Sequence, residues 1–430
     1  MLNDLKMLIE PYIEILCNIF QKDTWQHLKQ SDLLLVRHDN DCSYTFHKKA
    51  YAQIIDSFGE VATKRGLTIG AVATPFSRLV GERAFYSPRS YNQSISKIKI
   101  LGKFIRVITG QNAGTEWVAA RQVDLWCKIL KTASPICVIG IQPNESLCRA
   151  GKLKNIPIYD IQHGVIADAH PWYGEIYRKD TSIQNLPDGF LCWDEPSTVT
   201  ISKWAVNKGI RVLNVGNPWF LRFFKNQNDD QLVNEALAED SPIDDDERPR
   251  IVVSLQWGLA IEYPDRIFNG VIVDALEQVI LSTEQSYNWI LRLHPAQLRG
   301  VEREMCLTYL KKTFGAEKTQ KWLKTSELPL PVVLKKADLH ITDSSTVVIE
   351  AAWLGIRSGL LCEKLERGGK YEGYFSNERN TGMAEILSQN PQIIKQWIED
   401  ILAKGHGQPI LKDSGRNLDD FINEIARRKS

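Results

Sequence analysis

The chain has 430 residues, of which 43% are hydrophobic and 24% are charged. This composition is that of a folded protein and excludes disordered, collagen-like and coiled-coil chains. The 53 Lys and Arg residues balance 52 Asp and Glu residues, which argues against nonspecific nucleic-acid binding, because that activity needs a basic excess. One hydrophobic core rarely serves so long a chain, so we expect two domains.

Residues 2–20 predict a helix, because apolar side chains recur at helical spacing from Leu5 to Leu16. The polar positions carry Asp4, Glu10 and Glu14, whereas signal peptides and membrane-surface helices are rich in Lys and Arg. We expect this helix to pack on the protein's own core. The eight cysteines are widely spaced with no CxxC pair, as in a cytoplasmic protein with reduced thiols, and a peripheral position at the inner membrane stays open.

The first half of the chain alternates short β-rich runs with longer helical stretches. The runs are LLLVR (33–37), TIGAVAT (68–74), ICVIGI (136–141), IPIYDI (156–161), GFLCW (189–193) and VLNVG (212–216). Continuous apolar strands separated by helices are typical of a parallel sheet that is covered on both faces. We therefore predict a Rossmann-like domain over residues 1–224.

Residues 225–250 are acidic and polar, and they predict an exposed helix and a linker. The strand pattern then restarts with IVVSLQ (251–256), WILRLH (289–294), DLHIT (338–342) and SGLLCE (358–363). A second Rossmann-like domain is expected over 251–430, with terminal helices in 384–430. The predicted class is α/β, and two such domains form the GT-B arrangement of many glycosyltransferases, whose active site lies in the cleft between the domains.

Ligands of such sheets bind beyond the carboxyl ends of the strands, and polar residues follow nearly every predicted strand. They are Arg37-His38-Asp39-Asn40, Gln142-Pro143-Asn144-Glu145, Gln162-His163-Gly164, Trp193-Asp194-Glu195, Gln256-Trp257-Gly258, His294-Pro295 and Asp343-Ser344-Ser345-Thr346. A protein with only a structural role would not need so many polar residues at its strand ends. We therefore expect a functional site at these ends.

The segment DLHITDSSTVVIEAAWLGI (338–356) predicts a strand followed by a helix that begins at the serines. Ser344, Ser345 and Thr346 can cap free N–H groups, and the positive end of the helix dipole favours a phosphate. A simple N-cap is the equal alternative. At the end of another strand, His294 and Arg292 could stabilise a leaving nucleotide by general-acid or electrostatic action.

His294-Pro295 followed about 50 residues later by Asp-Ser-Ser-Thr resembles the paired motifs of bacterial transferases that use CMP-activated sugars. Sialyltransferases, polysialyltransferases and Kdo transferases share the pair, and CDP-glycerol phosphotransferases have a similar one. The resemblance implies that His294, Ser344, Ser345 and Thr346 bind the donor nucleotide. Gln256, Gly258 and Arg292 join this donor set by their positions at strand ends.

In the first half, IPIYDIQHGVI, FLCWDE and VGNPW resemble bacterial capsule and lipopolysaccharide glycosyltransferases. LLLVRHDNDCSYTFHKKAY and ATPFS look most like the retaining β-Kdo transferases of glycosyltransferase family 99. This resemblance, collinear over most of the chain, implies transfer of Kdo from CMP-β-Kdo to a bacterial surface glycan, such as O-antigen or capsule. The implied partners are a lipid-linked glycan acceptor and subunits of a synthase complex.

Retention by double displacement needs a carboxylate nucleophile, and the resemblance implies an Asp without placing it. Asp194 is the first candidate and Asp160 the second, while His163 is the nearby imidazole. The structural alternatives are a helix cap for Asp194, a buried ion pair for Asp160 and a core position for His163. Asp39 and Glu145 also follow strands, although Glu145 suits the first turn of a helix.

Arg37, His38 and Asp39 would suit a carboxylated or phosphorylated acceptor, and a structural ion pair of Arg37 with Asp39 or Asp41 is equally consistent. No HExxH, P-loop or GxGxxG motif occurs, and the acidic run at 244–247 lies in the predicted linker, so no cofactor is expected and metal-independent chemistry is predicted. Alternative functions are transfer from CMP-sialic acid or CDP-glycerol on the same fold. A noncatalytic sugar-nucleotide-binding protein is the alternative from another class.

Overall fold

The computed structural model describes residues 18–224, 229–238, 247–259, 263, 271–410 and 415–429. The chain forms two compact units. The first contains the described parts of Met1–His163, Tyr177–Trp219 and Ser414–Ser430, and the second contains those of Gly164–Ile176 and Phe220–Asp413. Almost all of the predicted N-terminal helix lies outside the described residues.

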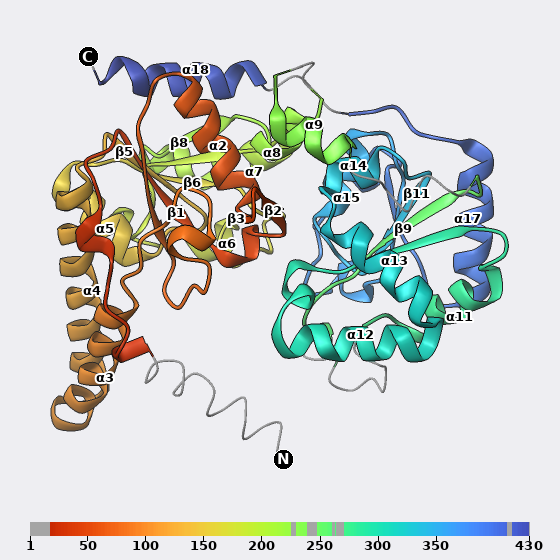
Figure 1. The fold of residues 1–430 in the computed structure, drawn as a ribbon, viewed down its shortest axis with the longest axis horizontal. Coiled ribbons are helices and arrows are strands. Elements are labelled where there is room, and N and C mark those ends of the chain that lie inside the picture. Colours follow the sequence, from red (N-terminus) through yellow and green to blue (C-terminus); the bar gives the residue numbers. More distant parts are fainter. Residues whose placement is uncertain are drawn as a thin grey trace. The chain divides into compact units, whose positions relative to one another are not determined.

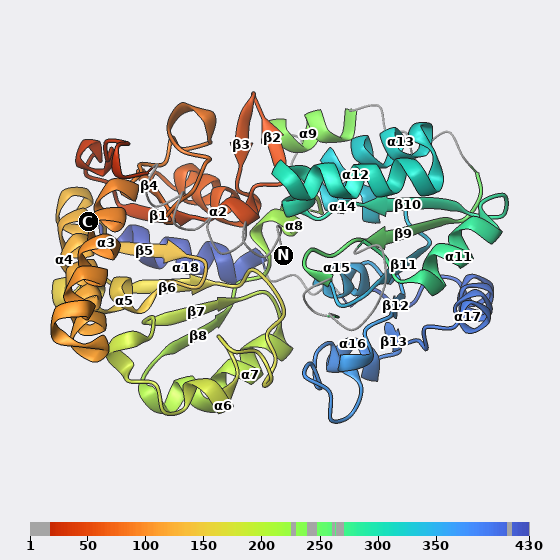
Figure 2. The ribbon, with the colours of Figure 1, turned by 90° about the horizontal axis from the view of Figure 1, so that it is seen from below.

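The first unit is built on six parallel strands in the order β4-β1-β5-β6-β7-β8 (Figures 1 and 2). They are β1 (Leu33–Arg37), β4 (Ile69–Ala73), β5 (Cys137–Gly140), β6 (Ile158–Ile161), β7 (Gly189–Cys192) and β8 (Arg211–Asn214). Every strand predicted in this half is present. All residues of β1, β5, β6 and β7 are buried, because helices cover both faces of the sheet.

A hairpin of β2 (Tyr44–Phe46) and β3 (Lys49–Tyr51) was not predicted. Its turn residues His47 and Lys48 both have positive φ angles, 48° and 62°. Tight hairpin turns usually place Asn, Asp or Gly at such positions. The sequence therefore gives no hairpin signal at this turn.

Helices and short 3-10 turns precede β1, connect the strands of the first unit and lead to β9. They are η1 (Trp25–His27), η2 (Asp39–Asp41), α2 (Gln53–Lys64), η3 (Gly81–Arg83), α3 (Asn92–Thr109), α4 (Gln111–Ala133), α5 (Glu145–Lys154), α6 (Glu175–Arg178), η4 (Ile183–Asn185), α7 (Glu195–Ala205), η5 (Val206–Lys208), α8 (Pro218–Arg222) and α9 (Gln231–Ala238). The predicted linker 225–250 thus contains α9, and this helix is not wholly exposed, because Leu232, Val233 and Ala236 are buried.

The C-terminal helix α18 (Gly415–Arg427) corrects the predicted domains 1–224 and 251–430, because it belongs to the first unit. Figure 1 shows it beside α2 and β8, and it contacts both. The ring of Phe421 packs on Phe58 and Tyr159, at centroid distances of 6.3 and 5.0 Å. Arg211 of the edge strand donates two hydrogen bonds to Glu424, of 2.8 and 2.9 Å. The other correction is that the loop Gly164–Ile176 groups with the second unit.

The second unit contains a parallel five-stranded sheet in the order β10-β9-β11-β12-β13 (Figure 2). Its strands are β9 (Arg250–Ser254), β10 (Asn288–Arg292), β11 (Leu339–Thr342), β12 (Ser358–Leu360) and β13 (Ala384–Ile386). The first four were predicted. The edge strand β13 was not, because we expected only helices from residue 384 onward. Three residues, one of them Glu385, are too few to show a strand pattern.

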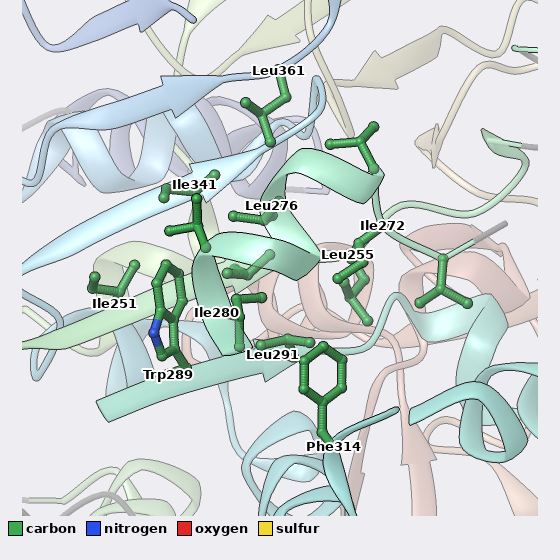
Figure 3. Close-up of a cluster of buried hydrophobic side chains, with 14 of the residues drawn as sticks. Ile251, Leu255, Ile272, Leu276, Ile280, Trp289, Leu291, Phe314, Ile341 and Leu361 are labelled. Carbon is green, nitrogen blue, oxygen red and sulfur yellow. The ribbon is translucent and has the colours of Figure 1, made fainter. Parts of the chain in front are cut away.

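The remaining helices follow the strands of this sheet. They are α11 (Asp274–Thr283), η6 (Pro295–Leu298), α12 (Gly300–Phe314), α13 (Ala316–Glu327), α14 (Leu330–Leu334), α15 (Val347–Trp353), η7 (Glu363–Leu365), α16 (Ser376–Asn380) and α17 (Pro391–Lys404). Figure 3 shows the core between the sheet and α11, where Ile251, Leu291 and Ile341 contact Leu276 and Ile280 across the layer. This core holds β9, β10 and β11 in place, and so fixes where their carboxyl ends lie.

Both sheets have a switch point, where the chain changes the direction in which it adds strands. In the first sheet the switch lies between β1 and β5, and in the second between β9 and β11. Open α/β sheets bind ligands outside the carboxyl ends of the strands at such a point. These two places are therefore the candidate ligand sites of the two sheets.

Candidate functional site

The switch point of the second sheet joins two predicted donor residues. Gln256 follows β9 and Ser344 follows β11, and the side-chain oxygen of Gln256 accepts hydrogen bonds from the Ser344 N–H at 2.6 Å and from its Oγ at 3.3 Å. Gly258, two residues after Gln256, has a φ of +81°, which turns the chain sharply away from the strand. The structure thus brings Gln256, Gly258 and Ser344 to one sheet edge.

The turn that contains Ser345 and Thr346 is half-exposed and connects β11 to α15. Ser345 donates its N–H to Thr342 Oγ1 and accepts the N–H of Val347, both at 3.4 Å. The helix begins at Val347, after the serines, and has only seven residues. We therefore ascribe ligand-binding capacity here to the hydroxyl and N–H groups and not to a helix dipole.

His294 follows β10, the edge strand beside β9. Its Nδ1 accepts the N–H of Ala296 at 3.1 Å, so the neutral ring carries its proton on Nε2. Burial lowers the pKa of His294 to about 4. A neutral His294 thus presents an Nε2–H donor.

Gln297 connects His294 to Gln256, and the sequence analysis missed it. It is 3% exposed. Its side-chain oxygen accepts the His294 N–H at 2.9 Å, and its side-chain nitrogen donates to the Gln256 carbonyl at 3.2 Å. The spacing His294-x-x-Gln297 is that of a capping box, and this signal in the sequence could have revealed it.

Arg292, predicted to bind the donor, instead has a structural role. Its guanidinium is buried and donates to the carbonyls of Thr325 at 2.8 Å and Leu328 at 2.7 Å, at the end of α13. Burial lowers the pKa of Arg292 to about 10, and burial raises the pKa of the neighbouring Glu350 to about 8, against the opposing effect of Arg292.

Asp343 lies beneath the serine turn and contacts Tyr263, another residue that the sequence analysis did not select. The hydroxyl of Tyr263 donates to Asp343 at 3.2 Å and lies 3.0 Å from Cys362 Sγ. Burial, followed by the charge of Asp343, raises the pKa of Tyr263. A small cavity beside Asp343 is lined mainly by apolar residues, among them Leu259 and Val271.

In the first unit, Arg37 is corrected from acceptor binding to a buried ion pair. The Arg37 guanidinium donates to both carboxylate oxygens of Asp56, at 2.8 and 2.7 Å, and to the Ala50 carbonyl at 3.0 Å. Arg37 is 2% exposed and Asp56 is fully buried. An ion pair of Arg37 was an alternative prediction with Asp39 or Asp41 as the partner, whereas the observed partner comes from α2.

His38 and Asp39, also predicted to bind the acceptor, lie at the end of β1. The Nδ1 of His38 accepts the Asn40 N–H at 3.1 Å, and burial lowers the pKa of His38. Asp39 accepts a short hydrogen bond from the Ser77 hydroxyl and another of 2.8 Å from the Arg78 N–H. Asp39 thus orders the loop after β4, while His38 keeps a half-exposed ring.

His163 follows β6, and its Nε2 lies 3.7 Å from Asp41 Oδ1. Asp41 is buried and accepts the N–H groups of Ile54 and Ile55 at the start of α2. Burial raises the pKa of Asp41 to about 8, although the two N–H groups oppose this shift. His163 is one-third exposed, so it is not a core histidine, and its ring stays accessible beside a buried carboxyl group.

Asp160 and Asp194 occupy neighbouring strands but differ in accessibility. Asp160, within β6, is 1% exposed, and its Oδ1 accepts the Gln142 N–H at 2.9 Å. Asp194, directly after β7, is half-buried, and its Oδ1 accepts the Ser197 N–H at 2.9 Å as the N-cap of α7. Burial raises the pKa of Asp194. The cap that the sequence analysis gave as an alternative is therefore present.

Gln162 links the ends of these two strands. Its side-chain oxygen accepts the Trp193 N–H at 2.7 Å, and its nitrogen donates to Ser197 Oγ at 3.1 Å. The residues that flank Gln162 and Trp193 along the chain, His163 and Asp194, are thereby held on adjacent strands. Among the residues that the structure describes, no group of three or more His, Cys, Asp or Glu residues could hold a metal ion.

No protein-family model matches the chain, and no curated protein sequence is significantly similar to it. Solved structures do share its fold. A UDP-GlcNAc 2-epimerase from Neisseria meningitidis bound to UDP-GlcNAc has 13% identity and a TM-score of 0.53, over 92% of this chain and 99% of the epimerase. The wall teichoic acid polymerase TagF, in an H444N variant with CDPG, has 12% identity and a TM-score of 0.53, over 97% and 94% of the chains.

A third structure, S. aureus MnaA with UDP, has 12% identity and a TM-score of 0.53, over 94% of this chain and 97% of that chain. These likenesses extend over almost the whole chain and confirm the predicted fold class. The protein has a GT-B-like fold of two Rossmann-like units. At identities of 12–13% they establish the fold alone.

None of the helices in the described ranges is long and apolar enough to cross a membrane.

Proposed function

We propose that this protein is a glycosyltransferase whose donor is a CMP-activated acidic sugar, with CMP-β-Kdo as the first candidate. One observation carries the proposal: the hydrogen-bonded set of Gln256, Ser344, Gln297 and His294 at the switch point of the second sheet. These side chains present amide, hydroxyl and imidazole groups in the place where an open α/β sheet binds its ligand. The nucleotide is proposed to bind here.

The proposed chemistry of this set is neutral hydrogen bonding to a phosphate. The Nε2–H of His294 donates to a phosphate oxygen of the nucleotide, and the Ser345 hydroxyl donates to another. The Ser344 hydroxyl donates to a third once it turns away from Gln256. Such donors stabilise the charge that develops on CMP as its bond to the sugar breaks. No metal or cofactor has a part in this proposal, and unchanged activity in EDTA would support that.

Cytidine and Kdo, the finer parts of the proposal, rest on the sequence resemblance. His294-Pro295 with Asp343-Ser344-Ser345-Thr346 resembles the motif pair of CMP-sugar transferases, and the first-unit motifs resemble β-Kdo transferases of surface glycans. The solved structures support a nucleotide-activated donor in general, because those proteins were solved with UDP-GlcNAc, UDP and CDPG. The proposed acceptor is a lipid-linked O-antigen or capsule glycan, and synthase subunits remain proposed partners at the cytoplasmic face of the inner membrane.

Retention by double displacement assigns a role to one carboxylate. It attacks the anomeric carbon, the bond to the CMP phosphate breaks, and a glycosyl ester forms; the acceptor hydroxyl then displaces the carboxylate and loses its proton to a base. Asp194 is the first candidate nucleophile, because it is half-buried, although its carboxylate caps α7 and hydrogen-bonds to Ser197. Asp160 would first have to become accessible. The exposed ring of His163 is the proposed base.

The decisive experiment is intact-protein mass spectrometry after incubation with CMP-Kdo generated in situ, without acceptor. We expect a mass increase of one Kdo. Asp194→Asn should abolish it, because the amide keeps an oxygen to cap α7 but cannot act as the nucleophile. Asp160→Asn identifies the nucleophile if it alone abolishes the adduct, and Asp124→Asn on the exposed face of α4 is the matched control.

If no adduct forms and no CMP is released with glycan acceptors, the Kdo proposal is wrong. The second candidate is then transfer from CDP-glycerol, because TagF with CDPG is among the structures that share the fold. Release of CMP from CDP-glycerol or from CMP-sialic acid would identify the donor. Tight CMP binding without turnover of any of the three would indicate a noncatalytic binding protein.

A further inference from the structure

The helical hairpin of α3 and α4 carries an exposed apolar surface that no described part of the chain covers. The surface consists of Leu101, Phe104, Val107 and Ile108, which are 52, 63, 87 and 81% exposed. Their spacing places them on one face of α3, near its C-terminal end. We call these four residues the α3 surface. Four large apolar side chains gathered on one helix face mark an interaction site, whereas single exposed ones do not.

The hairpin is a rigid support for this surface, because its two helices pack closely through two glycines. A Cβ on Gly102 would lie 2.1 Å from Val118 Cγ2, and one on Gly114 would lie 2.8 Å from the Arg106 Cα. Only glycine permits such an approach. The α3 surface is therefore displayed by a fixed pair of helices and not by a loop.

Only one end of the hairpin belongs to the core of the first unit. The core includes Ile95 near the start of α3 and the second half of α4 from Val123 onward, with Trp126 and Ile129. The end that carries the α3 surface extends away from the sheet, as Figure 1 shows for the two helices at the lower left. Its apolar side chains thus contribute nothing to that core.

The charged side chains of α3 itself are all positive. α3 contains Lys97, Lys99, Lys103 and Arg106, and residues 92–115 contain no Asp or Glu. Lys97 and Lys103 are exposed beside the apolar side chains. The whole chain is nearly neutral at +1, so this concentration of cations is local. An apolar face bordered by Lys and Arg has the chemistry of helices that lie in the headgroup region of anionic bilayers.

We propose that the α3 surface docks the protein on the surface of an anionic lipid bilayer. The four apolar side chains enter the boundary between headgroups and acyl chains, and the flanking cations contact lipid phosphates. A second copy of the chain is the less suitable occupant, because two such surfaces face to face would bring like charges together. The inference does not depend on the identity of the sugar donor.

The test is co-sedimentation of the full-length protein with vesicles of phosphatidylcholine alone and of equal parts phosphatidylcholine and phosphatidylglycerol. We expect binding to the anionic vesicles that weakens with added salt. A Phe104→Ser, Val107→Ser variant should bind at least about tenfold more weakly, because it loses two buried apolar side chains. A Lys97→Gln, Lys103→Gln variant should lose about fivefold for each cation and most of the preference for anionic lipid.

The matched control is a Leu153→Ser, Val199→Ser variant, which removes two apolar side chains, 68 and 50% exposed, elsewhere on the same unit. It should bind vesicles as the unchanged protein does, and circular dichroism during heating verifies that all variants fold. Failure of the unchanged protein to bind anionic vesicles would overturn the proposal. So would equal binding by the α3 variants and the control, or a dimer that the Phe104→Ser, Val107→Ser variant abolishes in the absence of vesicle binding.

Discussion

The carboxyl edges of the two sheets carry similar residue types but use them differently. At the first sheet, Arg37 pairs with Asp56, Asp39 holds the loop at Ser77, and Asp160 accepts a backbone N–H. At the second sheet, the groups of Ser344 and His294 are held by neutral hydrogen bonds and stay half-exposed. A charged residue after a buried strand is thus often needed for the fold, whereas small hydroxyls at a switch point remain available to a ligand.

The largest expected effect is a loss of stability when the buried ion pair of the first unit is broken. Arg37→Leu should lower the free energy of unfolding by about 3–5 kcal/mol, because it leaves the Asp56 carboxylate buried without its cation. Urea unfolding followed by circular dichroism measures this. An Arg37→Leu, Asp56→Leu double variant should regain part of the loss. Normal stability of Arg37→Leu together with lost acceptor use would restore Arg37 to the binding site.

The next effect concerns ligand binding by the second unit. His294→Ala should weaken CMP binding by a factor of about 10 to 100, since a hydrogen bond to a charged group contributes about 1.5–3 kcal/mol. Isothermal titration calorimetry measures the affinity. His170→Ala is the matched control, because His170 also precedes a proline but packs its ring against Tyr173 in the loop after β6. Equal effects of the two variants would contradict the donor site proposed here.

Gln297 should affect binding through the residues that it positions. Gln297→Leu removes both hydrogen bonds, to the His294 N–H and to the Gln256 carbonyl, and should weaken CMP binding about tenfold. Gln297→Glu keeps the acceptor for the His294 N–H and should recover part of that loss, in the same calorimetric assay. If Glu and Leu variants bind CMP equally weakly while both unfold at a lower temperature, Gln297 serves the fold alone.

The smallest expected effect is a pH dependence of the second unit's stability. His340 is fully buried between Ser358 and Ser254, and burial lowers its pKa to about 3. The folded chain therefore keeps His340 neutral, while the unfolded chain binds a proton below its ordinary pKa of about 6.5. Stability should be nearly unaffected above that pH and should fall by about 1.4 kcal/mol at pH 5.5.

Thermal unfolding of the unchanged protein and of His340→Gln between pH 8 and pH 5 measures this difference. The variant should be less stable at pH 8 but should lose less stability on acidification. Parallel pH profiles would show that His340 is not the group responsible.

The strands were predictable because burial on both faces of a parallel sheet demands continuous apolar runs, and all ten predicted runs form strands. The elements that were missed are not under this constraint. Strand β13 is a three-residue edge strand, and the β2–β3 hairpin turns at His47 and Lys48 without a glycine. The turn of Ser344, Ser345 and Thr346 could be predicted as a candidate site because these residues are adjacent in the chain.

The partners of the charged residues could not be predicted in the same way. Asp56 lies 19 residues from Arg37, within a helix whose polar positions all look alike in the sequence. Arg292 finds its carbonyl partners 33 and 36 residues away. Such pairs are determined by how helices lie on the sheet, and a single sequence contains no signal for that. The structure is therefore needed to show whether a charged residue at the end of a strand is accessible to a ligand.

The return of α18 to the first unit has a consequence for how the protein is made. The chain passes from one unit to the other at residues 163, 176, 219 and 413, so the first unit is discontinuous. During synthesis from the N-terminus, the six strands of its sheet emerge from the ribosome long before Phe421 and Glu424 arrive to cover Phe58, Tyr159 and Arg211. The first unit is therefore begun first and completed last, and a nascent or prematurely terminated chain presents to chaperones the apolar surface that α18 covers in the finished protein.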